Sequence, residues 1–387
     1  MFRVVGVSPI LRKVNASSSG TQEKTPPSAI PALERIVYLL DRTLAPSPKV
    51  RAFANAKDIV ADLGDEAIAE RVRNGTLEEV PGIGKSTGAV ITEVVKGVEP
   101  EYLRKLEATS EVPITEAGAV YRAALKGDCH LHSNWSDGGA PIEAMARTAM
   151  GLGHEYMVLT DHSPRLTVAH GLNRTRLLEQ LDVIDALNES LAPFRILTGM
   201  EVDINEDGTL DQDDDMLERL DVVVASVHSK LRMDSADMTQ RMVLAIASPH
   251  TDILGHCTGR QVGKPQVQRV LEGADGDTPE PTRNEDPKRP PSSFDAEMVF
   301  AACQRFDKAV EINCRPERQD PPDHLLALAL EWGCKISIDT DAHAPGQLEW
   351  QNFGCDKAAR HGIEVDRIIN TWDADRLLAW TSEHPHT

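Results

Sequence analysis

Apolar residues recur with two different periods along the chain, one in the first third and another in the remainder. Between residues 31 and 96 they return at helical spacing, for example at Leu33, Ile36 and Leu40, which places them on one face of a helix. From Lys126 onward, short β-rich runs alternate with longer runs of helical period. The pattern predicts a small all-α domain followed by a larger α/β domain.

The first domain is expected to contain several short helices. Pro46 and Pro48 should end the first helix, because proline disrupts a helix interior. Further helices are expected over residues 50–63 and 67–74, and another after the glycine-rich turn at residues 81–85.

The second domain contains seven predicted strands, with helices between most of them. Alternating strands and helices predict a parallel sheet, which can stay open or close into a barrel. The predicted strands are residues 129–132, 156–160, 196–204, 222–227, 252–255, 309–313 and 335–339.

Composition sets the expected domain boundaries. Residues 1–29 contain a stretch rich in Ser, Thr, Pro and Gly and predict a flexible arm. Residues 30–98 form the helical domain, and residues 99–125 are expected to link it to the α/β domain over residues 126–387. Within that domain, residues 272–292 are rich in proline and charge, and they predict a disordered surface loop because they cannot bury apolar surface.

Neither a membrane span nor a secretory signal is evident. No apolar run approaches the ~18 residues needed to span a bilayer, and Arg3, Arg12 and Lys13 interrupt the N-terminal apolar stretch. We therefore expect a cytoplasmic protein without a membrane partner, whose six cysteines are reduced thiols. The cysteines show no CxxC spacing, which argues against a cysteine zinc site. The oligomeric state stays open.

The charge of the chain narrows the choice of partner. The net charge is −20, and the residues from 127 onward carry −21, which the slightly basic N-terminus offsets. A strongly acidic body usually repels polyanions such as nucleic acid. That argument fails when the acidic groups surround multivalent cations, because bound metal inverts the local field.

Side chains that bind metals occupy corresponding positions in the predicted α/β domain. His130 and His132 lie two residues apart in the first strand, so both side chains point to the same face. Asp341 and His343 repeat this spacing just after the last strand. The other candidates lie near the ends of intervening strands or in the loop after the first one: Asp137, His162, Glu201, His228 and His256.

These side chains have to be interpreted as a set. A single histidine is more often structural than a ligand, but these nine side chains share one place relative to the strands, on the face where parallel barrels carry their active sites. Imidazole and carboxylate without thiolate suit zinc, manganese or iron. Because they are too many for one tetrahedral ion, we expect two or three divalent ions, with Glu201 as the bridging carboxylate.

Seven motifs carry a family resemblance: residues 127–138, 159–163, 199–202, 226–229, 254–256, 311–313 and 339–343. In order and spacing they resemble the motifs of the PHP (polymerase and histidinol phosphatase) family over roughly residues 126–360. The resemblance implies a distorted seven-stranded barrel with three metal ions. It implies one ion held by His130, His132, Glu201 and Asp341, a second held by Glu201, His228 and His256, and a third held by Asp137, His162 and His343.

The helical segment resembles the N-terminal helix-hairpin-helix domain of family X DNA polymerases, through residues 33–44, 49–53 and 80–85. In such a hairpin, glycines let backbone amides approach a phosphate, and a helix N-terminus adds a favourable dipole. A plain helix–helix turn would use the same glycines. The resemblance implies DNA contact through the side chains or backbone of Arg51, Gly82, Gly84 and Lys85.

The chain departs from bacterial family X polymerases in two ways. Those enzymes place a polymerase palm between the helical domain and the PHP domain, whereas only residues 97–125 separate the two here, which leaves no room for polymerisation. The position of the Schiff-base lysine of that family is Val90 in this chain, so lyase activity is not expected.

These features predict a metal-dependent phosphoesterase acting on DNA 3′ ends in repair, as a 3′-5′ exonuclease or a 3′-phosphatase. The catalytic candidates are Glu201, Asn313, Arg260 and Arg315. The two arginines are included because an arginine can hold a phosphate with two parallel hydrogen bonds. Two alternatives stay open. One is a small-molecule phosphatase of the histidinol-phosphatase type, against which the helical domain argues. The other is a non-catalytic protein that binds DNA ends, against which the complete ligand set argues.

Overall fold

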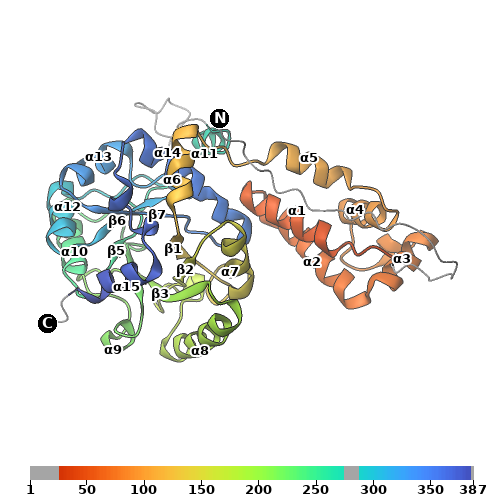
Figure 1. Cartoon of the computed structure of the whole chain (residues 1–387), viewed down its shortest axis with the longest axis horizontal. Helices are drawn as coiled ribbons and strands as arrows, with labels where there is room; N and C mark the ends of the chain where they lie inside the picture. Colours follow the sequence, from red (N-terminus) through yellow and green to blue (C-terminus); the bar gives the residue numbers. More distant parts are fainter. Residues whose placement is uncertain (1–25, 274–286, 385–387) are drawn as a thin grey trace.

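The structure, a computed structural model, describes residues 26–273 and 287–384 (Figure 1). Most of the expected N-terminal arm, residues 1–25, lies outside the described residues. So do residues 274–286 of the expected disordered loop. The end of that loop is described, and Arg289 pairs there with Gln261 in an antiparallel bridge.

The helical domain buries one small apolar core. Leu33 and Ile36 from the first helix pack there with Phe53, Val60 and Ile91. The domain consists of α1 (Ile30–Arg42), α2 (Ser47–Leu63), α3 (Asp65–Asn74), the short 3₁₀ turn η1 (Leu77–Glu79), α4 (Lys85–Val95) and α5 (Glu101–Thr109).

The segment expected to be a linker contains two helices, α5 and α6 (Glu116–Ala124). In α5, Tyr102 stacks on Phe53 with ring centroids 5.0 Å apart, so this helix completes the core of the helical domain. The side chain of Thr115 caps α6, and the hydroxyl of Tyr121 donates to the carbonyl of Ile363 at 2.8 Å. The segment is therefore packed at both ends, on the helical domain and on the second domain.

The second domain is a parallel barrel whose seven strands lie in chain order. The last strand returns beside the first: the amide of Asp341 donates to the carbonyl of His130 at 2.9 Å, and the amide of His132 to the carbonyl of Ala342 at 2.8 Å. Of the two arrangements that the pattern allowed, the structure shows the barrel. The strands are β1 (Gly127–Leu131), β2 (Tyr156–Leu159), β3 (Arg195–Asp203), β4 (Val222–Ser226), β5 (Ile253–Leu254), β6 (Ala309–Asn313) and β7 (Lys335–Asp339).

Helices surround the barrel and bury its outer face (Figure 1). Met242 of α10 and Phe300 of α12 belong to the same apolar cluster as Val223 and Val310 from the strands. The helices are α7 (Ile142–Gly151), α8 (Arg174–Leu191), α9 (Asp214–Leu217), α10 (Ser235–Ile246), α11 (Lys264–Leu271), α12 (Ala296–Arg305), α13 (Asp323–Glu331), α14 (Gln351–Arg360) and α15 (Ala374–Ser382). Short 3₁₀ turns lie at η2 (Thr167–Ala169), η3 (Pro345–Trp350), η4 (Val365–Arg367) and η5 (Ile369–Thr371).

The two domains are in direct contact through α1 and η3. Arg42 donates to Glu349 at 2.6 Å, and the indole of Trp350 donates to the carbonyl of Arg42 at 3.0 Å. Tyr38 also donates its hydroxyl to Glu349. A Cβ at Gly346 would lie 2.1 Å from the carbonyl oxygen of Tyr38, so this close approach of helix and turn requires glycine.

Two expectations about the chain as a whole can be compared with the structure. All six cysteines are buried and unbridged. Among residues 26–273 and 287–384, none of the helices combines the length and the apolarity that a bilayer span needs.

Candidate metal centre

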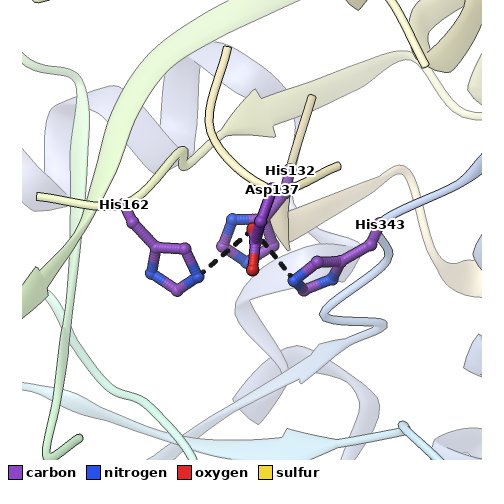
Figure 2. Close-up of side chains that lie close together, drawn as sticks. All are labelled: His132, Asp137, His162 and His343. Atoms are coloured by element: carbon purple, nitrogen blue, oxygen red, sulfur yellow. Dashed lines mark ion pairs between the residues drawn. The ribbon is translucent and has the colours of Figure 1, made fainter. Parts of the chain in front are cut away.

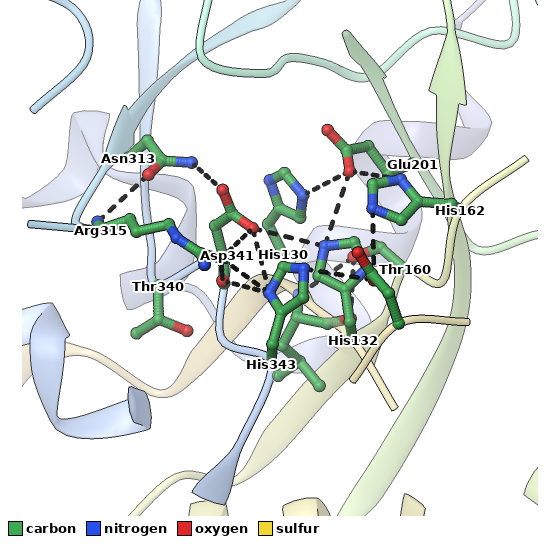
Figure 3. A network of polar contacts seen from close by, with 12 residues as sticks. His130, His132, Thr160, His162, Glu201, Asn313, Arg315, Thr340, Asp341 and His343 are labelled. Atoms are coloured by element: carbon green, nitrogen blue, oxygen red, sulfur yellow. Dashed lines mark hydrogen bonds and ion pairs between the residues drawn. The ribbon is translucent and has the colours of Figure 1, made fainter. Parts of the chain in front are cut away.

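All nine predicted ligands meet at the mouth of the barrel, because each lies at or just after the C-terminal end of a strand. His130 lies in β1 and Glu201 in β3, whereas His228 follows β4 and His256 follows β5. Since the strands are parallel, these ends share one face of the barrel. Figures 2 and 3 show the imidazole and carboxylate groups converging there.

Glu201 lies at the centre of the cluster and presents its two oxygens to different imidazoles. Its Oε2 lies 3.0 Å from Nδ1 of His162 and 3.3 Å from Nε2 of His130. Its Oε1 lies 2.8 Å from Nε2 of His256 and 3.2 Å from Nε2 of His228. A carboxylate arranged in this way can bridge two cations.

Asp137 forms a second focus of the cluster, between His162 and His343 (Figure 2). Its Oδ1 lies 3.3 Å from Nε2 of His343 and 3.5 Å from Nε2 of His162. The ring of His132 lies 4.4 Å from that of His162 and 4.2 Å from that of His343. His162 therefore directs one nitrogen at Asp137 and the other at Glu201.

Asp341 occupies the third focus, with Nε2 of His132 3.5 Å from its Oδ1. Its backbone has φ 50°, in the left-handed region that costs energy for residues with a side chain. Asn313 donates to the Oδ2 of Asp341 at 3.1 Å, and Arg318 donates to the same oxygen at 2.8 Å (Asn313 is drawn in Figure 3). Two hydrogen bonds thus fix the Oδ2 of this carboxylate.

Electrostatics keep the central carboxylates ionised despite their burial. Burial alone would raise the pKa of Glu201, but His130, His228 and His162 outweigh it and hold that pKa well below its usual value. Burial likewise opposes Arg318 and His132 at Asp341, whose pKa is also held well below its usual range.

Two of the histidines are kept neutral. Burial, aided by the positive charges of His343 and His162, lowers the pKa of His132 to about 3. Burial and Arg318 lower the pKa of His256 to about 3. Metal binding requires deprotonated imidazole, so both side chains are in the ligand form at neutral pH.

The donor set fits divalent cations. Buried ring nitrogens of His130, His132, His162, His228 and His256 have no hydrogen-bond partner within the described chain, although such atoms normally find one. Three groups of donor atoms lie close enough together to hold an ion: His132 with Asp137, His162 and His343; His130 with His132 and Asp341; and His162 with Glu201 and His228. Their grouping resembles the three implied ion sites only in part: His132 and His162 each belong to two groups, Glu201 is grouped with His228 but not with His130, and His256 belongs to none of the three.

Several carboxylates behind the ligands were not predicted as site residues. Glu311 lies 2.6 Å from Nδ1 of His130 and accepts from the amide of His256 at 2.5 Å. Asp203 accepts from the amide of His228 at 3.0 Å. Such partners orient ligating imidazoles and fix their tautomers. A signal was present in the sequence, because Asp203 follows Glu201 by two residues and Glu311 precedes Asn313 by two, so each pair shares one face of a strand.

Asp161 performs a similar task for the loop that carries Asp137. Its carboxylate accepts from the hydroxyl of Ser133 at 2.6 Å, from the hydroxyl of Ser136 at 2.5 Å and from the side-chain amide of Gln180 at 2.7 Å. The loop after β1 is therefore fastened to β2 and α8.

The two arginines that were predicted to bind phosphate lie in different places. Arg315 lies at the candidate metal centre, with Nη1 2.9 Å from Nδ1 of His343. Arg260 instead donates Nε to the carbonyl of Arg318 at 3.0 Å and Nη2 to the carbonyl of Gln319. Arg260 thus holds the loop after β6, and Arg318 on that loop joins Arg315 beside the predicted ligands.

Three of the four residues predicted to contact DNA lie together at the hairpin of the helical domain. Gly82, Gly84 and Lys85 line a cavity of about 460 Å³, together with Lys49 and Phe53. Gly82 has φ 95°, a conformation that favours glycine. Arg51 is exposed on α2 and does not line this cavity, whereas Lys49, two residues before it, does.

Comparison with known proteins agrees with this geometry. The PHP domain family matches residues 128–273. The chain is 36% identical over 246 residues to the "DNA polymerase/3'-5' exonuclease PolX" of Bacillus subtilis, covering 64% of this chain and 39% of that protein. The chain thus spans about two fifths of that relative.

The chain covers a larger share of two other similar proteins. A probable phosphatase of Caldanaerobacter subterraneus is 32% identical over 227 residues, which cover 56% of this chain and 75% of that protein. The crystal structure of a histidinol phosphate phosphatase from Lactococcus lactis, complexed with zinc, L-histidinol and phosphate, aligns with a TM-score of 0.39 at 16% identity. That alignment covers 62% of this chain and 94% of that one.

Proposed function

The chain belongs to the PHP domain family and is a metal-dependent phosphoester hydrolase, and on that premise we propose that it hydrolyses phosphoester bonds at the 3′ ends of DNA. The helical domain is the observation that supports DNA as the substrate. Its hairpin cavity is lined by Lys49, Lys85 and backbone of the glycine turn, and its first helix is docked on η3, which begins two residues after His343.

The side chains at the barrel mouth would divide the work of hydrolysis. Divalent zinc, manganese or iron, when bound, would supply Lewis acidity and lower the pKa of water. Glu201 offsets the charge of two neighbouring cations. Arg315 and Arg318 lie beside Asp341 and can donate hydrogen bonds to a phosphoryl oxygen. Glu311 contacts Nδ1 of His130 and thereby orients the ring, so that Nε2 of His130 points at Glu201.

The helical domain would hold the DNA. Helix α4 begins at Lys85. The backbone amides of its first turn, together with the two lysines, suit a phosphate of the DNA backbone. Contact there carries no sequence information, so the domain would bind DNA by its backbone.

A panel assay tests this function. The purified protein is incubated with single-stranded DNA, 3′-phosphorylated DNA and 4-nitrophenyl phosphate, in the presence of zinc, manganese or iron. We expect release of nucleotide or inorganic phosphate from the DNA substrates, and loss of both with a chelator. His130→Ala should abolish the activity, whereas His324→Ala, at an exposed histidine on α13, should leave it unchanged.

Small-molecule phosphatase activity is the second candidate. It is favoured by the likeness to a probable phosphatase of which the chain covers 75%. Fast hydrolysis of the chromogenic monoester with no release from either DNA substrate would support it and contradict the DNA proposal. Bound metal at trace level in active protein would contradict both.

A further inference from the structure

Arginines border the metal centre on the side of β5 and β6, in a chain whose net charge is −20. Arg315 and Arg318 come from the loop after β6, and Arg289 comes from the segment that pairs with Gln261. Positive side chains gathered beside one site of an acidic protein point to an anionic ligand at that site.

Arg318 faces several carboxylates, yet one of its nitrogens is left without a hydrogen-bond partner in the described chain. Its Nε donates to Asp341 at 2.8 Å, and its side chain is 14% exposed. Its Nη1 is buried without a hydrogen-bond partner in the described chain. A buried donor left unpaired costs about 1–3 kcal/mol, so this nitrogen favours an acceptor supplied from outside the protein.

Arg289 reaches the same region from a different segment. Its Nε donates to the carbonyl of Gly259 at 2.6 Å, and its backbone pairs with Gln261 in both directions. The two terminal nitrogens have no partner among residues 26–273 and 287–384. Burial and the nearby guanidinium of Arg318 both lower the pKa of Arg289, and Asp320 opposes them.

The two arginines are held in fixed positions relative to each other. Gly259, which accepts from Arg289, precedes Arg260, which donates to the carbonyl of Arg318. Asp320 adds a second tie, because it accepts from the hydroxyl of Thr258 at 2.8 Å. Two guanidinium groups held near each other, with donors left over, are suited to a phosphate placed between them.

We propose that Arg289 and Arg318 bind a second phosphate of the substrate, the one next to the phosphoester that the metal centre hydrolyses. The substrate is then a polynucleotide strand and not an isolated monoester, because only a strand carries a neighbouring phosphodiester. This inference rests on the proposed function of the metal centre, and it assigns Arg289 to substrate binding only.

The variant Arg289→Gln tests the inference, with Lys288→Gln as the matched control. Lys288 is exposed and adjacent, and it carries the same charge. For a single-stranded oligonucleotide, we expect Arg289→Gln to raise KM about tenfold with kcat within about twofold, as for one lost phosphate contact. KM and kcat for 4-nitrophenyl phosphate should stay unchanged. Lys288→Gln should alter the oligonucleotide KM less than about twofold.

Binding gives a readout that does not depend on turnover. Fluorescence anisotropy with a labelled oligonucleotide, in chelator so that no hydrolysis occurs, should show a weaker Kd for Arg289→Gln. The slope of log Kd against log salt should fall by about 0.7–1. Arg289→Lys keeps the charge and should recover most of the affinity, which loss of folding would not allow.

The outcomes separate this inference from the proposed function. Equal loss on the oligonucleotide and on the chromogenic ester, or no loss on either, overturns the role of Arg289 while phosphoesterase activity stands. If the wild-type protein turns over neither substrate with any of the metals, the proposed function fails first. An unchanged salt slope in Arg289→Gln would also overturn the inference.

Discussion

Glu201 presents each carboxylate oxygen to a different group of imidazoles, so its charge serves two cation positions at once. Glu201→Gln keeps the size and removes the charge. We expect it to release at least one metal equivalent and to lower kcat about 100-fold or more, because a bridging carboxylate offsets the repulsion between two dications. Metal stoichiometry of the purified variant, with the rate beside it, measures this.

Asp137→Asn is the comparison for Glu201→Gln. Asp137 lies on a loop and faces His162 and His343, so the variant should weaken binding of one ion and leave the others. If Glu201→Gln retains all metal and full rate while Asp137→Asn does not, the bridge is assigned to the wrong residue.

Glu311 gives a second prediction at the residue scale. It is fully buried, contacts His130 and accepts from the amide of His256. Loss of such an orienting partner typically costs 10–100-fold in metal affinity, and we expect Glu311→Gln to do so in a chelator-competition titration. Glu218→Gln, at an exposed carboxylate of the same domain, should bind metal like the wild type; equal affinity in both variants would contradict an orienting role.

The candidate ligands could be located as a set because strand periodicity places them, but their supporting partners required the fold. His130 and Glu201 follow an alternation visible in the sequence, whereas the contact between His130 and Glu311 joins strands far apart in the chain. Arg260 and Arg318 illustrate the limit. Arg260 follows the predicted ligand His256 by four residues, whereas Arg318 is 23 residues from Asp341, and only the path of the loop after β6 decides which guanidinium reaches Asp341.

At the scale of elements, all seven strands were predictable, because apolar β-rich runs flanked by helical periods are a strong local signal. The helices α5 and α6 were not. Each is nine residues long, and isolated helices that short are marginal in water. Their stability comes from packing on Phe53 in one case and on α14 in the other, which no local pattern reveals.

The hairpin between η1 and α4 carries the prediction at this scale. If its cavity holds a DNA phosphate, Lys49→Gln and Lys85→Gln should each weaken DNA binding several-fold and lower the salt slope by about one. Arg51→Gln removes the same charge from a residue that does not line the cavity and should have a smaller effect. Anisotropy titrations at several salt concentrations measure this; a larger effect of Arg51→Gln would return the contact to the face predicted from sequence.

For the whole molecule, the contact between the domains means that removing the helical domain would test more than DNA binding. Removal of residues 1–120 would leave every predicted ligand in place. It would also uncover Trp350, which is fully buried, and cut α6 in the middle. Since η3 follows His343 and the amide of His343 donates to Gln347 at 2.7 Å, loss of α1 would disturb the support of a predicted ligand. Point variants in the full chain are therefore the sounder way to separate DNA binding from hydrolysis.

Asp41 connects the domain contact to pH. It lines a cavity of about 370 Å³ between α1, α2 and the start of α7, together with Glu34, Tyr38 and Lys57. Burial raises the pKa of Asp41 to about 6. A carboxyl whose folded pKa exceeds its unfolded value of ~3.9 holds its proton more tightly when folded. Its contribution to stability is therefore complete below about pH 4 and is lost as the pH rises to about 6.

Asp41→Asn removes this titration, because an amide keeps the neutral shape at every pH. We expect the variant to be more stable than the wild type at pH 7.5, by on the order of 2 kcal/mol, with the difference shrinking as the pH falls toward 4. Urea unfolding followed across that range measures it. Asp62→Asn, at an exposed position on α2, should show no such trend. A difference between Asp41→Asn and the wild type that stays constant with pH would mean that folding does not shift the pKa of Asp41, and that the cavity between the domains is wetter than its burial implies.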